Sequence, residues 1–152
     1  MKVREIMTAQ PKTASPGTTL AAAAHLLWDA DCGILPVVEG SQLVGVVTDR
    51  DMYVALATRN KPASQITVGD VASGAVRACG PDDEVQVALN TMKTHRIRRL
   101  PVVDAGALVG IISMNDVVLA AGAGKAVRNE EVVDVLKAIC AHPAATPAAA
   151  AA

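Results

Sequence analysis

A short polar segment at the end of an apolar run carries the residues best suited to binding an anion. Thr48-Asp49-Arg50-Asp51 follows the β-branched run 43–47 and opens a helical pattern. The first N–H groups of a helix have no intrahelical partners, and together with a hydroxyl they can bind phosphate. Asp51 lies one helical turn further and can accept hydrogen bonds from both hydroxyls of a ribose. The segment is therefore a candidate sugar-phosphate site that contains Thr48, Arg50 and Asp51.

A second segment repeats this arrangement with one change. Ser113-Met114-Asn115-Asp116 also joins an apolar run to a helical pattern, and it keeps the hydroxyl of Ser113 and the carboxylate of Asp116. Asn115 stands where the first segment has Arg50, so we expect a weaker hold on phosphate here. In the alternative interpretation both segments are ordinary helix caps, whose hydroxyls and aspartates stabilise the start of a helix by about 0.5 to 2 kcal/mol.

Positive charge is concentrated just before one apolar run. Residues 95–99 read His-Arg-Ile-Arg-Arg, whereas the corresponding place in the first half of the chain has Ala30 and Asp31. The planar guanidinium of arginine suits phosphate but also surface carboxylates, so a solvated basic turn or a subunit contact is the alternative. The asymmetry predicts one good anion site and not two.

The two polar segments belong to an internal repeat. Pro36 and Pro101 are 65 positions apart, and this offset aligns residues 3–55 with 68–120 without a gap. It places Leu35-Pro36-Val37-Val38 on Leu100-Pro101-Val102-Val103. A fixed offset over this length indicates a duplicated structural unit.

Each copy shows the pattern of a helix followed by a hairpin and a second helix. Apolar residues at i, i+3, i+4 and i+7 mark the first helix, at Leu20, Ala23, Ala24 and Leu27 and again at Val85, Ala88, Leu89 and Met92. The short β-branched runs 34–38 and 43–47, and their equivalents 99–103 and 108–112, predict the hairpins. Thr48 and Ser113 are expected to cap the second helices.

The repeat predicts an α/β fold of two β-α-β-β-α motifs, with a first strand near Thr13 or Ala78. A unit of about 55 residues is marginal alone, so we expect the copies to pack sheet to sheet with pseudo-twofold symmetry. The expected divisions are motif 1 at 1–59, a linker at 60–65, motif 2 at 66–121, a C-terminal loop and helix at 122–142, and a disordered Ala/Pro tail at 143–152.

The C-terminal helix is expected to begin with Asn129 as its cap and to end at Cys140. Its apolar stripe is predicted at Val132, Val133, Leu136 and Ile139. A helix of this length is marginal without packing, so it should dock on the module or on a second subunit.

Composition and motifs argue against several classes of function. A net charge of −1 and the presence of one Trp, one Tyr and no Phe argue against nucleic-acid binding. No run approaches the roughly 18 apolar residues of a membrane span, and the charged start lacks a signal peptide, so a cytoplasmic location is expected. No nucleophile has an adjacent base, so we expect no enzyme activity. The three cysteines and three histidines lack zinc-ligand spacing, so no metal is expected.

The repeated motifs resemble the CBS domain family. They are Leu-Pro-Val-Val, then Leu-Val-Gly followed by two apolar residues and Thr or Ser, then an Asp three positions later, and they cover roughly residues 1–121. The C-terminal helix is similar to that of stand-alone bacterial two-CBS proteins. The resemblance implies a paired regulatory module, or Bateman module, that senses AMP, ADP, ATP or a related adenosyl ligand without any catalytic cofactor. It also implies a homodimer, and a regulated protein that acts in trans.

The resemblance further implies roles for individual residues. Residues matching His95 and Arg96 commonly meet nucleotide phosphates in the cleft between the motifs. Adenine would lie between strand backbones and apolar walls, whereas the two prolines fix the strand starts and need not touch a ligand. The expected nucleotide-binding residues are Thr48, Arg50, Asp51, His95, Arg96, Ser113, Asp116, Ile34, Leu35, Pro36, Arg99, Leu100 and Pro101. The alternative function is a structural or protein-interaction CBS module that binds no nucleotide.

Overall fold

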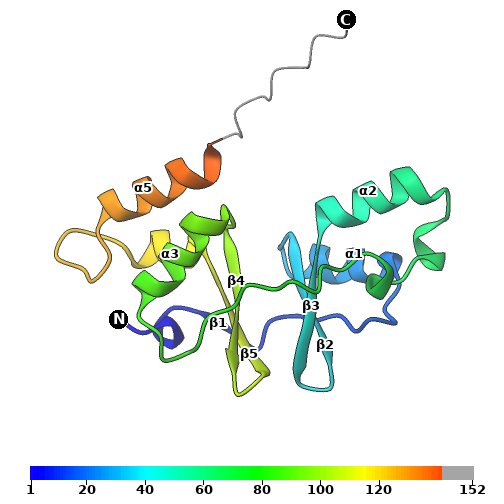
Figure 1. Cartoon of the computed structure of the whole chain (residues 1–152), viewed down its shortest axis with the longest axis horizontal. Helices are drawn as coiled ribbons and strands as arrows, with labels where there is room; N and C mark the ends of the chain where they lie inside the picture. The colour runs from blue at the N-terminus through cyan, green and yellow to red at the C-terminus, as the bar shows by residue number, and fades with distance from the viewer. Residues whose placement is uncertain (142–152) are drawn as a thin grey trace, which may run out of the picture.

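The helices and strands follow the repeat. The computed structural model describes residues 1–141, so the predicted tail at 143–152 lies outside the described residues (Figure 1). The first half contains α1 (Leu20–Asp29), β2 (Ile34–Glu39), β3 (Gln42–Thr48) and α2 (Asp49–Arg59). The second half contains α3 (Val85–His95), β4 (Arg99–Asp104), β5 (Ala107–Ser113) and α4 (Met114–Ala120), and α5 (Asn129–Cys140) follows. The short strand β1 (Thr8–Ala9) and single 3-10 turns at Val3–Glu5, Ala63–Gln65 and Val68–Asp70 complete the chain.

Both predicted hairpins are confirmed, and they have the same register. β2 and β3 pair from Ile34–Thr48 to Glu39–Gln42, and β4 and β5 pair at the equivalent residues, with an irregularity at the same place in each. The turns need left-handed backbone conformations, which Gly40 provides in the first hairpin with a φ of 62°.

The two hairpins join in one sheet through β3 and β5. Gln42 pairs with Ala107, and these two residues are equivalent in the repeat. Reciprocal backbone hydrogen bonds flank the pair, from the amide of Leu43 to the oxygen of Gly106 (3.4 Å) and from the amide of Leu108 to the oxygen of Ser41 (2.9 Å). The expected pseudo-twofold axis therefore passes between Gln42 and Ala107, and the fold of two CBS-like motifs with a C-terminal helix is confirmed.

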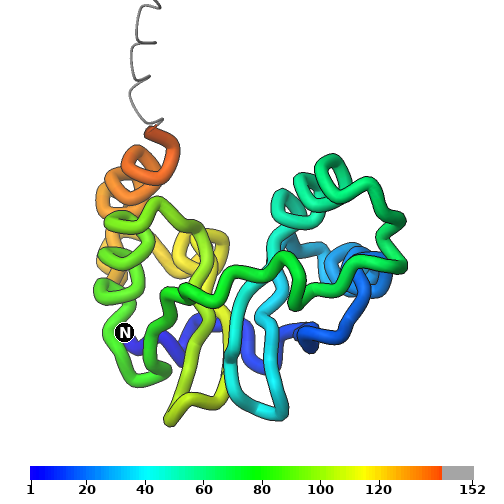
Figure 2. Tube along the Cα trace, turned by 45° about the vertical axis from the view of Figure 1, so that its right-hand side comes forward, coloured from blue at the N-terminus to red at the C-terminus, as the bar shows by residue number. Residues whose placement is uncertain are grey.

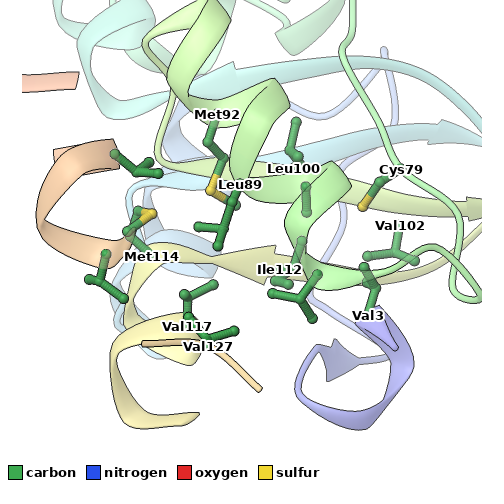
Figure 3. Close-up of a cluster of buried hydrophobic side chains, with 14 residues drawn as sticks. Val3, Cys79, Leu89, Met92, Leu100, Val102, Ile112, Met114, Val117 and Val127 are labelled. Carbon is green, nitrogen blue, oxygen red and sulfur yellow. The ribbon is translucent and has the colours of Figure 1, made fainter. Parts of the chain in front are cut away.

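The segment that opens each copy packs on the other copy. The amide of Val3 donates to the oxygen of Asp83 (2.9 Å), and the amide of the equivalent Val68 donates to the oxygen of Thr18 (2.7 Å). Both valines are fully buried, Val3 in the hydrophobic cluster of the second half and Val68 in that of the first. Figure 3 shows Val3 beside Val102 and Cys79 of the second half. The N-terminus accordingly lies near α3 and far from α1 (Figures 1 and 2).

Glycine in the Leu-Val-Gly motif allows these crossing segments to approach the strands closely. A Cβ on Gly45 would lie 3.0 Å from the carbonyl oxygen of Ser73, and a Cβ on Gly110 would lie 3.1 Å from that of Thr8. Both distances are tighter than ordinary packing permits, so these positions favour glycine.

The hydrophobic residues form two separate clusters, one in each half, and no polar side chain of residues 1–141 is buried. Most predicted core positions are confirmed, but Ala24 is exposed because no helix lies over this face of α1 in the described chain. The predicted apolar stripe of α5 is wrong at Val133, which is exposed. Val135 is buried beside Val132 in its place. The cap of α5 is Arg128 and not Asn129, which is the first helical residue.

The predicted first strands are reduced to single bridges. Ala14 bridges Val37, and Cys79 bridges Val102, both in parallel. Prolines at positions 11, 16 and 81 flank these points, and proline cannot donate to a strand ladder, which explains why neither segment extends into a strand.

An exposed ion pair at the crossing segment makes stability depend on acid pH. Lys2 Nζ lies 2.8 Å from Glu84 Oε1, and its hydrogen bond, together with that of the N-terminal ammonium, lowers the pKa of Glu84 from 4.5 to about 2. The folded-state pKa is depressed, so this contribution is fully present above about pH 4.5 and is lost as the pH falls toward 2. Replacing Lys2 by alanine should flatten the decline of unfolding free energy in this window. Urea titrations across it should show no such change for Lys12→Ala, and an equal change in both variants would contradict the assignment.

Candidate functional site

The start of α2 forms a closed capping arrangement around Asp51. Thr48 donates to Asp51 Oδ2 from its backbone N–H (2.9 Å) and from Oγ1 (2.7 Å), and the amide of Asp51 donates back to Thr48 Oγ1 (3.2 Å). The predicted cap is therefore confirmed, and the carboxylate is held in a fixed orientation by two hydrogen bonds on one oxygen.

The start of α4 repeats this geometry. Asp116 Oδ2 accepts from the amide of Ser113 (2.7 Å) and from its Oγ (2.6 Å). Within residues 1–141, Oδ1 of Asp51 and Oδ1 of Asp116 have no recorded hydrogen bond, and both aspartates are half-buried. Each aspartate thus combines a capping oxygen with a second oxygen that is available to a ligand.

An open groove of about 600 Å³ runs from the junction of the two halves along α1 and α2; we refer to it as the α1/α2 groove. Its mouth brings together residues of both halves, with Gly33 and Asp49 from the first and Arg98 and Arg99 from the second. Its far part lies between the helices and is lined by Ala24, Leu27, Trp28, Met52, Tyr53 and Leu56. The mouth therefore offers two guanidinium groups next to the start of a helix, a combination that suits an anionic ligand.

The predicted residues lie at different depths around this mouth. Arg99 lines the groove, and Thr48 and Ile34 are half-buried at adjoining strand ends, where they pair in the sheet. Leu35 and Leu100 are fully buried in the two hydrophobic clusters, and Pro36 and Pro101 are buried as well. Because all four side chains are buried, a ligand would meet them only after their neighbours move.

The predicted phosphate-binding residues are exposed and do not line the groove. His95 is the last residue of α3, and Arg96 caps it in a left-handed conformation with φ 55°. Asp31, the equivalent of Arg96, has a φ of 47° and does line the groove. Arg50 is also exposed, one residue after Asp49. In this arrangement the positive charges that line the groove are those of Arg98 and Arg99, and the carboxylates of Asp31 and Asp49 line it as well.

Sequence reasoning missed several groove residues. Arg98 was noted only as part of a basic run, and Asp49 only as part of the capping segment. Trp28 and Tyr53, the single Trp and the single Tyr of the chain, come together in the groove, with 85% and 74% of their surface exposed. The exposure of Trp28 could be predicted from the sequence, because Trp28 comes one position after Leu27 and so lies outside the apolar stripe of α1.

The described residues offer no metal cluster and no membrane helix. No group of three or more His, Cys, Asp or Glu side chains in residues 1–141 could hold an ion, and no helix there has the length and apolar character needed to cross a bilayer. His142 lies outside the described residues. Burial, with a smaller effect of Asp83, raises the pKa of the Cys79 thiol to about 11, which keeps it protonated and unreactive.

Comparison with known proteins identifies the repeat. The family model of the CBS domain matches residues 3–58 and again 68–122. The chain belongs to the CBS domain family. The family model therefore matches both copies of the repeat, and each matched range contains one hairpin and one Thr/Ser-x-x-Asp cap.

One relative aligns with nearly the whole chain. Hypoxic response protein 1 of Mycobacterium tuberculosis is 30% identical over 138 residues, which are 90% of this chain and 92% of that protein. Its crystal structure, described with two coordinated zinc ions, has a TM-score of 0.72 and covers 78% of this chain and 98% of that one.

Two further CBS structures contain adenosyl ligands. CBSX2, in complex with AMP, is 29% identical with a TM-score of 0.69, over 78% of this chain and 94% of that one. The CBS pair of protein MJ0100, in complex with 5'-methylthioadenosine and S-adenosyl-L-methionine, is 28% identical with a TM-score of 0.71, over 78% of this chain and 94% of that one. These two CBS proteins therefore bind ligands that contain an adenosyl group.

Proposed function

We propose that this chain is a non-catalytic regulatory module that binds an adenine nucleotide of the AMP, ADP or ATP class between its two CBS motifs and signals to a partner protein in trans. The observation that carries the proposal is the mouth of the α1/α2 groove, which is lined from both motifs. A ligand held there would contact both halves at once, so its binding would change how they sit together. That is the property a regulatory module needs.

The proposed contacts combine Arg99 at the mouth with residues around it that do not line the groove, among them Asp51 at the start of α2. Asp51 Oδ1 would accept hydrogen bonds from the ribose hydroxyls, while Oδ2 remains in the cap. Phosphates would meet Arg99 and the exposed Arg50, His95 and Arg96, and the base would lie near Ile34. The structures of CBSX2 with AMP and of MJ0100 with adenosyl ligands support this ligand class.

One observation favours the second candidate function, a structural or protein-interaction module that binds no nucleotide. The two caps are nearly identical, and each is closed by its own Thr or Ser. Such caps stabilise a helix without any ligand.

Ligand binding should raise thermal stability. At about 100 times its dissociation constant, AMP or ATP should add about 2.7 kcal/mol to the free energy of unfolding and raise Tm by several degrees. Calorimetry with AMP, ADP, ATP, S-adenosylmethionine and NAD should give one ligand per chain. Absence of both heat and thermal shift with every adenosyl ligand at millimolar concentration would reject the nucleotide function and favour the second candidate.

We also propose that two copies of the module form a homodimer, as the family resemblance implies. No catalytic cofactor enters the proposal, and the adenine nucleotide acts as a regulatory ligand.

A further inference from the structure

The two motifs carry opposite charges at the ends of equivalent helices. The last turn of α3 contains Lys93 and His95, and Arg96 follows it as the cap. The last turn of α1 contains no basic residue, and Asp31 stands at the position equivalent to Arg96. Because the C-terminal end of a helix carries a partial negative charge, cations there offset it and a carboxylate adds to it. The first motif therefore presents a negative helix end where the second presents a positive one.

The negative end of α1 faces the α1/α2 groove. Asp31 and Asp49 line this groove, and so do Arg98 and Arg99. The ion pairs recorded within residues 1–141 involve none of these four side chains. A hydrogen bond from the amide of Arg50 reaches Asp49 Oδ1 (2.8 Å), but it leaves the charge of the carboxylate in place. A ligand in the groove therefore meets both signs of charge.

The charges around the proposed phosphate contacts nearly cancel. With histidine counted as neutral, Arg50 and Arg96 join the two arginines of the groove, and Asp51 joins its two aspartates. Four positive charges then face three negative ones, an excess of one. A single phosphate carries a charge of about −1.5 to −2 at pH 7, and each further phosphate of a nucleotide adds about one more. This excess suits the single phosphate of AMP, whereas ATP would bring added negative charge to a mouth that has too few cations for it.

We propose that Asp31 and Asp49 make the site selective for a nucleoside monophosphate over nucleoside di- and triphosphates. The inference rests on the nucleotide function proposed above and names the ligand of the same site. Repulsion between like charges falls off slowly with distance, so both carboxylates act on phosphates that they do not touch. AMP should bind most tightly and ADP less so, and the affinity for ATP should be about tenfold or more below that for AMP.

A series of charges at position 31 tests this selectivity. Asp31 has a φ of 47°, a conformation that asparagine accepts readily, and Arg96 adopts a φ of 55° at the equivalent position of the second motif. Asp31→Asn and Asp31→Arg therefore keep the backbone while they change the side-chain charge to zero and to positive. Calorimetry without divalent cations should show the ratio of AMP to ATP affinity fall to about threefold in Asp31→Asn and to about one or below in Asp31→Arg.

Asp29→Asn is the matched control. Asp29 is the last residue of α1 and is exposed, but it does not line the groove. The substitution removes the same formal charge from the chain, so the affinity ratio should change by less than about twofold. Raising the ionic strength from about 0.1 to about 1 M shortens the Debye length from about 10 to about 3 Å, so it should narrow the difference between AMP and ATP in the unmodified chain. Circular dichroism should show all three variants folded, because both positions are exposed.

Equal affinities of AMP and ATP for the unmodified chain would overturn the selectivity, as would an unchanged ratio in both Asp31 variants or an equal change in Asp29→Asn. A preference for AMP that is the same at both ionic strengths would contradict its assignment to these carboxylates. In each of these results AMP still binds, so the nucleotide function stands. Absence of binding by every adenosyl ligand would instead reject that function, and the selectivity with it.

Discussion

Replacing Asp51 by alanine is expected to weaken AMP binding by about 10- to 100-fold, because hydrogen bonds to a carboxylate are worth about 1.5 to 3 kcal/mol each in net terms. Because two hydrogen bonds from Thr48 already orient the Asp51 carboxylate, this side chain would lose little conformational freedom on binding a ribose. Calorimetry on the purified variant measures the loss directly.

Asp116→Ala is the matched control. Both substitutions remove the same cap, so both should lower the free energy of unfolding by a similar amount, about 1 kcal/mol. The difference between the two variants in AMP affinity therefore isolates the ligand contact from the cap. If Asp116→Ala weakens binding and Asp51→Ala does not, the site belongs to the second motif.

A buried charge at Val3 should have the largest effect on stability. Val3→Asp would bury a carboxylate without a partner in the cluster of the second motif, which we expect to cost about 3 to 5 kcal/mol. The loss of stable structure should be confined to the second motif, even though the substitution lies at the start of the first. Hydrogen exchange should show loss of protection first in β4 and β5.

Val68→Asp provides the reciprocal experiment. Val68 lies in the cluster of the first motif, so its substitution should first expose β2 and β3. If Val3→Asp instead causes the amides of β2 and β3 to lose protection from hydrogen exchange, the packing of each opening segment on the other copy is contradicted.

Much of the fold follows from local signals in the sequence. The β-branched runs and the turn at Gly40 predict the hairpins because period and turn chemistry act over a few residues. Thr48 and Ser113 predict the helix starts in the same way, since a cap is decided by the residue itself and its neighbours three positions on. The 65-residue offset then implies the symmetry, which the pairing of Gln42 with Ala107 confirms.

The remaining features depend on contacts distant in sequence. Nothing in the local pattern around Val3 indicates that it packs against residues 76 positions away or more, although its equivalence with Val68 indicates that both have the same role. The choice between Val133 and Val135 depends on where α3 lies, which a helical period alone leaves open. The groove was missed for a similar reason, because Asp49 and Arg98 meet only through the arrangement of the two halves.

The crossing of the opening segments has a practical consequence for moving one motif into another protein. Residues 11–74 contain α1, β2, β3, α2 and the segment with Val68, so the first motif is continuous when the cut is placed there. The second motif is discontinuous, because it combines residues 1–10 with residues 75 onward. A cut at the repeat boundary would leave each fragment without one wall of its core, whereas a circular permutation that begins at residue 11 would make both motifs continuous.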